Sequence, residues 1–269
     1  MNIKSAICQL KTLQSKDTNL KKANKMIREA AANKAEIVIL PEIFNIPYDL
    51  NSFPLVAEEF PGQTTEMLSA LSKELKIYIV GGSICEKEND SFFNTSYSFD
   101  KSGRLIGKHR KLHLFDVNIK NKIIFKESDV MSPGNSITIL NTEFCKIGVL
   151  ICHDIRFPEI FMKMVLAGVK VIIAPSALNM ISGPYHCEVT ARARAVDNQI
   201  FFIVASPARD INASFVSYGH SFIVNPWGDK IVEADENECI LYGNIDLDLI
   251  EKVREELPLL KQRRPELYR

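Results

Sequence analysis

The sequence GVLICHDIRFPE, residues 148–159, leads from an apolar strand directly into the start of a helix. The residues before Cys152 are as hydrophobic as a buried strand, and Pro158 suits the first turn of the helix that we expect over residues 157–167. Cys152 therefore stands at a sharp turn of the kind that presents a nucleophile. The helix start adds backbone N–H groups and the positive end of a dipole, which favour a thiolate and an oxyanion.

The alternative for Cys152 is a buried structural thiol, the commonest state of a free cysteine. The polar residues that follow it at once speak against that alternative. A Cys–His dyad is a further possibility, but His153 is badly placed for it because neighbouring side chains on an extended segment point apart. Such a dyad would require His186 or His220 instead, and the sequence leaves this open.

Strand-like and helix-like segments alternate on both sides of this stretch. We expect strands at residues 3–10, 36–40, 77–84, 93–99, 104–108, 136–140, 145–151, 169–175, 200–206, 221–225, 230–233 and 239–245. We expect helices that begin near Asp17 or Thr18 and near Thr64 or Thr65, that cover residues 157–167 and 187–198, and that run from Asp246 to Pro258. No linker divides the chain, so the pattern predicts one α/β domain over residues 1–269, with two sheets and helices outside.

The composition excludes several other classes of protein. The 269 residues include 33 Lys+Arg and 33 Asp+Glu, and this balance argues against a nucleic-acid partner or a polybasic membrane partner. No apolar run approaches the roughly 20 residues of a membrane span, and Lys4 and Gln9 make the N-terminal segment unlike a signal peptide. The six cysteines are scattered without a CxxC pair, which predicts free thiols and a cytoplasmic protein.

A carboxylate follows the second predicted strand. In IVILPEIF, residues 37–44, Glu42 comes directly after the buried strand, and ligands bind at the carboxyl ends of strands in open α/β sheets. The alternative is a carboxylate that ends the strand in solvent. Taken alone, this segment favours the alternative, so Glu42 needs support from other parts of the chain.

Basic residues crowd the segment GKHRKLHLF, residues 107–115. If the segment continues a strand, Lys111 and His109 share one face, and Lys111 becomes a candidate fixed cation for a developing anion. The alternative is a solvated run of charges. A metal site at His109 and His113 is not expected, because the spacing lacks the Glu of HExxH and no third ligand is near. No GxGxxG or P-loop indicates a nucleotide, so we expect no cofactor.

Together, LPEIF around Glu42, KHRKLHLFD around Lys111 and LICHDIRFPE around Cys152 resemble the Glu–Lys–Cys triad of the nitrilase, or carbon–nitrogen hydrolase, superfamily. The similarity covers essentially the whole chain and is greatest to the omega-amidase branch. The stretches that indicate this branch are FNIPYD (44–49), GGSI (81–84), FKES (125–128), SPG (132–134), RAVDNQ (194–199), ASPARD (205–210) and VNPWG (224–228). The resemblance implies an α-β-β-α sandwich that forms a homodimer or larger homo-oligomer through helices and the C-terminal tail, about residues 257–269.

The resemblance also implies roles for individual residues. Cys152 corresponds to the nucleophile, Glu42 to the general base and Lys111 to the cation that faces the tetrahedral oxygen. Glu127 matches a second glutamate that holds the lysine and the substrate amide in place. His153 stands where relatives commonly have tyrosine or asparagine, and it contributes mainly its backbone N–H to the oxyanion.

The substrate class implied by the resemblance is the omega-amide of a 2-oxo dicarboxylic acid, with 2-oxoglutaramate first and 2-oxosuccinamate next. Such a molecule carries a free carboxylate at its far end, and the Arg156 fork and the Tyr48 hydroxyl are candidates to hold it. Phe44 and Phe115 are the expected apolar walls of the pocket. The alternative for Arg156 is a salt bridge to Glu159 at i+3.

Other functions stay open on the sequence. An amidase for deaminated glutathione or for an N-carbamoyl compound would differ in the pocket, where Cys187 stands at a position that is tryptophan in the omega-amidase branch. A nitrile-hydrolysing enzyme would share the triad. A catalytically inactive binding or scaffold protein is disfavoured because Glu42, Lys111, Glu127 and Cys152 are all present. A thiol-redox protein lacks a nearby resolving cysteine.

Overall fold

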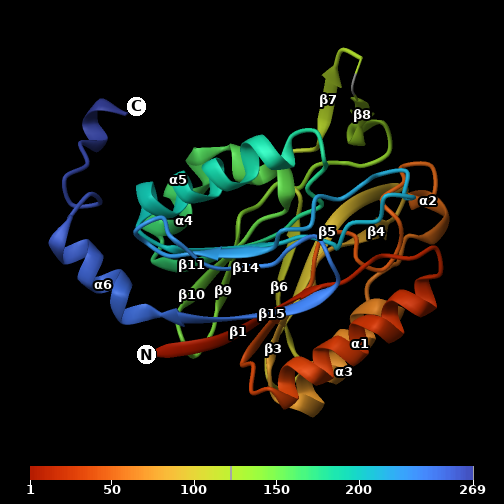
Figure 1. The fold of residues 1–269 in the computed structure, drawn as a ribbon, viewed down its shortest axis with the longest axis horizontal. Coiled ribbons are helices and arrows are strands. Elements are labelled where there is room, and N and C mark those ends of the chain that lie inside the picture. The colour runs from red at the N-terminus through yellow and green to blue at the C-terminus, as the bar shows by residue number, and fades with distance from the viewer. Residues whose placement is uncertain (122, 269) are drawn as a thin grey trace.

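Two β-sheets lie face to face in the computed structural model, which describes residues 1–121 and 123–268 (Figure 1). The first sheet has the strand order β15-β1-β2-β3-β5-β4, with β6 paired to β5. Its strands are β1 (Asn2–Gln9), β2 (Ile37–Ile39), β3 (Tyr78–Val80), β4 (Ile84–Glu88), β5 (Ser91–Phe99), β6 (Leu105–Arg110) and β15 (Cys239–Asp246).

The second sheet has the order β14-β13-β12-β11-β10-β9. Its strands are β9 (Thr138–Asn141), β10 (Lys146–Val149), β11 (Val169–Pro175), β12 (Phe201–Ala205), β13 (Phe222–Val224) and β14 (Lys230–Glu233). In each sheet three neighbouring strands are parallel, β1-β2-β3 and β10-β11-β12, and the strands beyond them are antiparallel. Both sheets therefore offer carboxyl ends of parallel strands, where α/β folds place ligands.

Helices cover the outer face of each sheet (Figure 1). Helices α1 (Lys16–Ala32) and α3 (Gln63–Leu75) pack on the first sheet, and α4 (Pro158–Leu166) and α5 (Glu188–Asn198) pack on the second. The short α2 (Phe53–Val56) lies near β4, and α6 (Leu247–Glu256) follows β15. The hairpin of β7 (Asp116–Ile119) and β8 (Ile123–Lys126) projects beyond the sandwich. The predicted α-β-β-α sandwich is confirmed.

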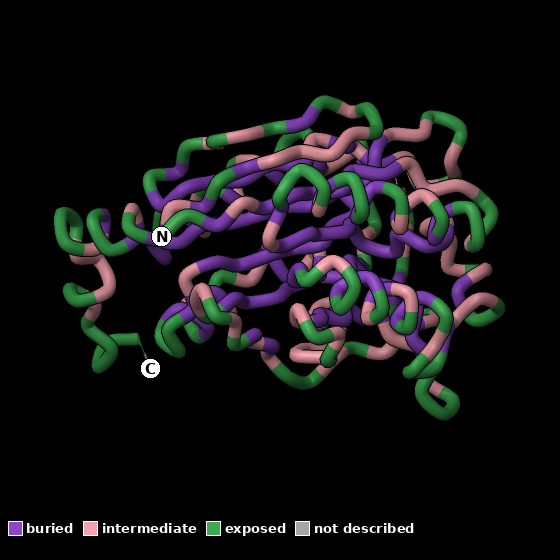
Figure 2. The backbone as a smooth tube through the Cα atoms, turned by 90° about the horizontal axis from the view of Figure 1, so that it is seen from below, coloured by how far each residue is buried: buried purple, intermediate pink, exposed green. Residues whose placement is uncertain are grey.

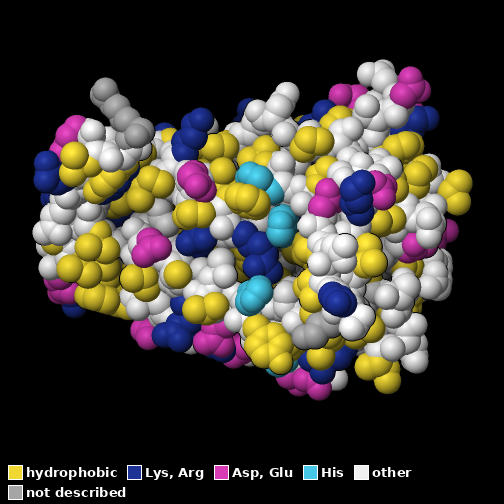
Figure 3. Space-filling view, turned by 90° about the horizontal axis from the view of Figure 1, so that it is seen from above, with side chains coloured by type: hydrophobic (Ala, Val, Ile, Leu, Met, Phe, Trp, Pro, Cys, Tyr) yellow, Lys and Arg dark blue, Asp and Glu magenta, His cyan; other side chains and the backbone are white. Residues whose placement is uncertain are grey.

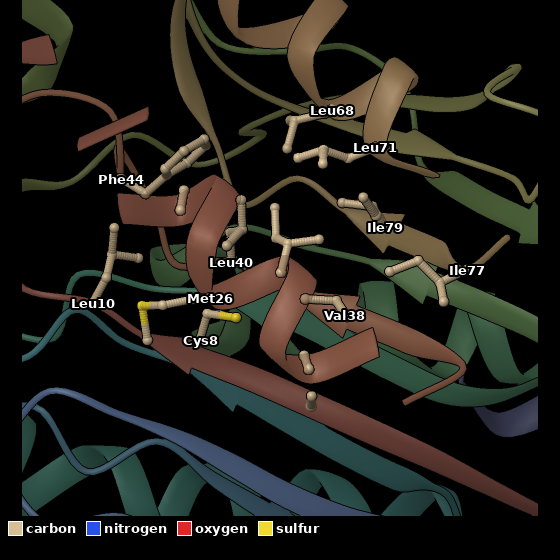
Figure 4. Close-up of a cluster of buried hydrophobic side chains, with 14 of the residues drawn as sticks. Cys8, Leu10, Met26, Val38, Leu40, Phe44, Leu68, Leu71, Ile77 and Ile79 are labelled. Atoms are coloured by element: carbon tan, nitrogen blue, oxygen red, sulfur yellow. The ribbon is translucent and has the colours of Figure 1, made fainter. Parts of the chain in front are cut away.

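Three apolar layers hold the sandwich together. One layer lies between the sheets and includes Ile7 and Ile39 from the first sheet and Val149 and Ile173 from the second. Another packs α1 and α3 against the first sheet (Figure 4), and the third packs α4 and α5 against the second. Figure 2 shows the buried backbone concentrated in the strands, which is why their sequences are continuous apolar runs. Each fully buried large aliphatic side chain contributes about 1.5–3 kcal/mol.

The structure divides the strand that was expected over residues 77–84. The chain leaves β3 after Val80 and resumes in β4 at Ile84. Gly82 has a φ of +59°, and a Cβ added there would lie 2.1 Å from the carbonyl oxygen of Pro41. Only glycine allows this close approach, and the approach brings the segment after β3 against the segment that carries Glu42.

Two helix starts also differ from the expectation. Ser15 caps α1, and its hydroxyl accepts a hydrogen bond from the backbone N–H of Thr18. Gly62 precedes α3, which begins at Gln63. Asp246 caps α6 as predicted, and α6 ends before Pro258. Within residues 1–121 and 123–268, the longest apolar helices fall short of what a membrane crossing requires.

Candidate active site

Cys152 occupies the turn between the second sheet and α4. Strand β10 ends at Val149, a 3-10 turn runs over Cys152–Arg156, and α4 begins at Pro158. Cys152 has a φ of +43°, a strained value for a residue with a side chain. The predicted strand–turn–helix is therefore confirmed, and the strained backbone angle belongs to Cys152, the candidate nucleophile at the turn.

The Asp154 carboxylate ties this turn to the end of β6. It accepts backbone hydrogen bonds from Ile151 (3.0 Å), Leu112 (3.2 Å) and His113 (2.9 Å). It also contacts His109 Nε2 at 3.2 Å and His113 Nδ1 at 2.8 Å. Burial alone would raise the pKa of Asp154, but the hydrogen bonds from the two histidines lower it well below its usual range. The segments that carry Lys111 and Cys152 are thus joined through one buried carboxylate.

Lys111 lies between two buried carboxylates. Its Nζ is 2.9 Å from Glu42 Oε1 and 2.8 Å from Glu127 Oε2, and all three side chains are at most 1% exposed. Burial would lower the pKa of Lys111, but Glu127 and Glu42 raise it above its usual range. Lys111 is therefore a permanent cation in this site.

Further polar groups orient the two carboxylates. Asn94 Nδ2 donates to Glu42 Oε1 at 2.8 Å and to Glu127 Oε1 at 3.1 Å. The Tyr48 hydroxyl donates to Glu127 Oε1 at 3.0 Å, and the Ala177 N–H donates to Glu42 Oε2 at 2.6 Å. Ala177 follows β11, the strand beside β10, so the Glu42 carboxylate is held by groups from both sheets.

The Cys152 thiol is protonated at rest. Burial and the neighbouring Glu42 carboxylate raise its pKa well above the usual value, and the opposing effect of Lys111 is smaller. The Glu42 carboxylate is close enough to the thiol to raise its pKa. A reaction at Cys152 therefore needs a neighbouring base, and Glu42 is the candidate.

A pocket opens beside the thiol. Lys111, Cys152, Tyr48 and Phe115 line it, together with Ile155, His153, Arg156, Ala177, Leu178, Asn179, Ser182 and Phe215. The Tyr48 and Phe215 rings stack at 4.8 Å between centroids, and Phe125 of β8 packs on both at 5.7 Å. On the other side of Tyr48 and Phe215, Glu42 borders a second hollow of about 260 Å³ with Thr12, Asp210 and Asn212.

The family model for carbon–nitrogen hydrolases matches residues 4–255. The chain belongs to this family. It is 47% identical over 253 residues to the omega-amidase NIT2-B of Xenopus laevis, covering 94% of this chain and 92% of the relative. It is 45% identical over 263 residues to the omega-amidase NIT2 of Mus musculus, covering 98% and 95%. The solved structure of Saccharomyces cerevisiae Nit3, a nitrilase-superfamily member, matches with a TM-score of 0.91 and 40% identity, covering 98% of this chain and 97% of Nit3.

These matches confirm the predicted membership of the nitrilase superfamily, and the protein is an omega-amidase-like carbon–nitrogen hydrolase. Its structure brings together Glu42, Lys111, Glu127 and Cys152, as the sequence led us to expect. Tyr48, Phe115, His153 and Arg156 all reach the same pocket.

Phe44 is a correction to the predicted site of this hydrolase. It was expected as a pocket wall, but its side chain is fully buried in the layer under α1 and α3 with Leu10 and Met26 (Figure 4). The reason is local, because Ile43 has a φ of +46° and turns the chain directly after Glu42. The Tyr48 hydroxyl was expected to hold the far carboxylate of a substrate, but it already contacts the carboxylates of Glu127 and Glu42 at 3.0 and 3.3 Å.

The alternatives considered for the other candidates are also resolved by their contacts. Arg156 Nη1 lies 3.1 Å from His186 Nδ1, and within the described residues no carboxylate forms a salt bridge with Arg156. His220 stacks on Tyr218 at 4.2 Å, so both histidines proposed for a Cys–His dyad have other partners. Cys187 is only 4% exposed and packs in the layer under α4 and α5, behind Ile155 and Leu178, so it does not itself line the pocket.

The sequence did not identify Asp154, Asn94 and Phe215 as site residues. Asp154 had a weak signal, since it lies in the polar run after Cys152. Asn94 is one of several polar residues in β5, and Phe215 lies in a segment without a recognisable motif, so neither residue had a sequence signal. Their positions depend on which strand ends and loops meet in space.

Proposed function

We propose that this hydrolase cleaves the omega-amide of 2-oxo dicarboxylic acid monoamides, 2-oxoglutaramate first and 2-oxosuccinamate next, to the dicarboxylate and ammonia. The observation that carries the proposal is the arrangement of one pocket: Arg156, which has no salt bridge to a carboxylate among the described residues, lines the same space as the Cys152 thiol and Lys111. The identity of about 45% to omega-amidases supports it.

The first half of the proposed reaction forms a thioester. Glu42 takes the thiol proton of Cys152, and the sulfur attacks the amide carbonyl carbon. Lys111 and the backbone N–H of His153 stabilise the tetrahedral oxygen, and losing one such donor typically costs about a hundred- to a thousandfold in rate. The carbon–nitrogen bond then breaks, and Glu42 returns its proton to the leaving ammonia.

The second half hydrolyses the thioester. Glu42, again a carboxylate, takes a proton from water as the water attacks the acyl carbon, and the sulfur leaves with that proton to restore the thiol. The raised pKa of Lys111 keeps its charge through both halves, so the same cation stabilises both tetrahedral intermediates. Glu127 and Asn94 position Lys111 and Glu42 throughout the cycle.

Arg156 supplies the preference for a substrate with a free carboxylate. A guanidinium binds a carboxylate through two parallel hydrogen bonds, and this pairing selects geometry as well as charge. Phe115 and Leu178 line the space between Arg156 and the thiol, where the carbon chain of the substrate would lie.

The test of the proposal is ammonia release from 2-oxoglutaramate, with glutamine as the comparison. We expect rapid release from 2-oxoglutaramate and little from glutamine, whose far end carries an ammonium group beside the carboxylate. Absence of turnover with 2-oxoglutaramate would refute the proposal and favour an amidase for deaminated glutathione or for an N-carbamoyl compound.

We further propose that the protein forms a homodimer in the cytoplasm. Exposed apolar side chains lie on α5, on the neighbouring turn and in the C-terminal tail: Val189, Val196, Trp227, Leu257 and Leu267. Burying them against a second copy would be favourable. The six free thiols suit a reducing compartment. Light scattering on a sizing column tests the dimer, and a monomer with full activity would contradict it.

A further inference from the structure

The guanidinium of Arg156 is held by a neutral side chain. His186 Nδ1 lies 3.1 Å from Arg156 Nη1, and a guanidinium has only donors. His186 Nδ1 must therefore accept, which places the imidazole proton on Nε2 and leaves the ring uncharged. Asp154, two residues before Arg156, contacts His109 and His113 instead, and Glu159, three residues after it, is exposed and forms no salt bridge with Arg156.

The local fold brings this imidazole to Arg156. A π-helical turn over Gly183–Cys187 precedes α5, and such turns insert one extra residue and redirect the side chains that follow. The backbone N–H of His186 donates to the carbonyl oxygen of Ser182 at 2.9 Å, and Ser182 itself lines the pocket. The same turn therefore sets both the pocket wall and the partner of Arg156.

A second arginine holds the backbone of Arg156. Arg194 on α5 donates from Nε to the carbonyl oxygen of Ile155 at 3.2 Å and from Nη2 to that of Arg156 at 3.1 Å. Figure 3 looks onto the face above α4 and α5 and shows histidine side chains beside Lys or Arg side chains in its middle. Both ends of Arg156 are thus fixed by groups that leave its positive charge uncompensated.

We infer that His186 is a specificity-determining positioning residue, which aims the Arg156 fork at the far carboxylate of the substrate without neutralising it. A carboxylate in place of His186 would orient Arg156 equally well, but it would compete with the substrate for the charge. A neutral acceptor gives orientation and leaves the charge for the substrate. This inference rests on the proposed function, because it requires a substrate with a free carboxylate.

The test compares two substrates that differ at one group. 4-Oxopentanamide has a methyl group where 2-oxoglutaramate has its far carboxylate. For His186→Ala we expect the KM for 2-oxoglutaramate to rise about three- to tenfold, the range that the loss of one hydrogen bond represents. The KM for 4-oxopentanamide should stay within twofold, and kcat for both substrates should change little.

Three further variants separate positioning from a general structural effect. His186→Asn places an amide oxygen near the site of Nδ1 and should restore the KM for 2-oxoglutaramate. His186→Asp should raise that KM beyond the His186→Ala value, because it neutralises Arg156. Tyr185→Ala, at an exposed residue of the same turn, is the control and should match the wild type.

Equal KM shifts on both substrates, a His186→Asn variant as impaired as His186→Ala, or unchanged KM values throughout would overturn the inference. A wild-type enzyme that turns over 2-oxoglutaramate no better than 4-oxopentanamide would instead overturn the proposed substrate class. The two failures are distinguishable because the second is read on the wild type alone.

Discussion

Replacing Asp154 by asparagine should damage both stability and turnover. Each carboxylate oxygen of Asp154 faces at least two donors: Oδ1 meets the His113 N–H and His113 Nδ1, and Oδ2 meets the Ile151 N–H and His109 Nε2. Asp154→Asn turns one oxygen into an NH₂ group that confronts two donors in a fully buried site. Hydrogen bonds to a charged group contribute about 1.5–3 kcal/mol each, so we expect a loss of about 3–5 kcal/mol.

The assay is the free energy of unfolding from urea titration, together with kcat on the same preparation. Because Asp154 joins the segments of Lys111 and Cys152, kcat should fall about tenfold or more under conditions in which the variant is still folded. Asp90→Asn, the same change at an exposed turn, is the matched control. A loss below about 1 kcal/mol, or an unchanged kcat, would refute the reasoning.

The same variant has a signature in its pH dependence. The pKa of Asp154 is lowered in the folded protein, so its ionised form stabilises the fold at pH values above the unfolded pKa of about 4. This contribution is lost progressively as the pH falls below that value. The difference in unfolding free energy between wild type and Asp154→Asn should therefore shrink below about pH 4. A difference that stays constant down to pH 2 would contradict the assignment.

Three further outcomes are expected. Cys152→Ala should abolish turnover in the ammonia assay while the circular dichroism spectrum stays unchanged, and retained activity would exclude the thioester route. Gly82→Ala should destabilise the fold by about 2–3 kcal/mol in thermal unfolding because its Cβ meets Pro41, whereas Gly168→Ala, with a similarly positive φ but 3.7 Å of clearance, should cost about 1 kcal/mol. Burial would raise the pKa of Glu86, but hydrogen bonds from Arg110, Lys108 and Thr95 lower it to about 2. Ionised Glu86 therefore stabilises the fold above its unfolded pKa, and this stability is lost as the pH falls through about 2. Between pH 5 and 2, the unfolding free energy of Glu86→Gln should fall by about 3 kcal/mol less than that of the wild type.

The parts of the site that were predictable from sequence have local causes. An apolar run followed by a polar turn and a proline is enough to place Cys152 between β10 and α4. Alternation along a strand placed Lys111 and His109 on one face, and both side chains are buried as that alternation requires.

The parts that were not predictable depend on backbone turns or on contacts between distant segments. Phe44 was misassigned because its expected place in the pocket followed from its closeness to Glu42 in the sequence, whereas the positive φ of Ile43 turns the chain between the two residues. Phe215 reaches the pocket only because the segment after β12 returns over Tyr48. The hairpin of β7 and β8 was missed because each of its strands is only four residues long.

The β7–β8 hairpin links access to the pocket with the charges inside it. Phe125 in β8 packs on Tyr48 and Phe215 over the pocket, and Glu127, two residues later, holds Lys111. Only Lys126 separates Phe125 from Glu127. Any displacement of Phe125 that widens the entrance must be absorbed within that one residue, or it pulls Glu127 away from Lys111. The aromatic side chain over the pocket and the carboxylate that holds Lys111 are therefore coupled in position through a single residue.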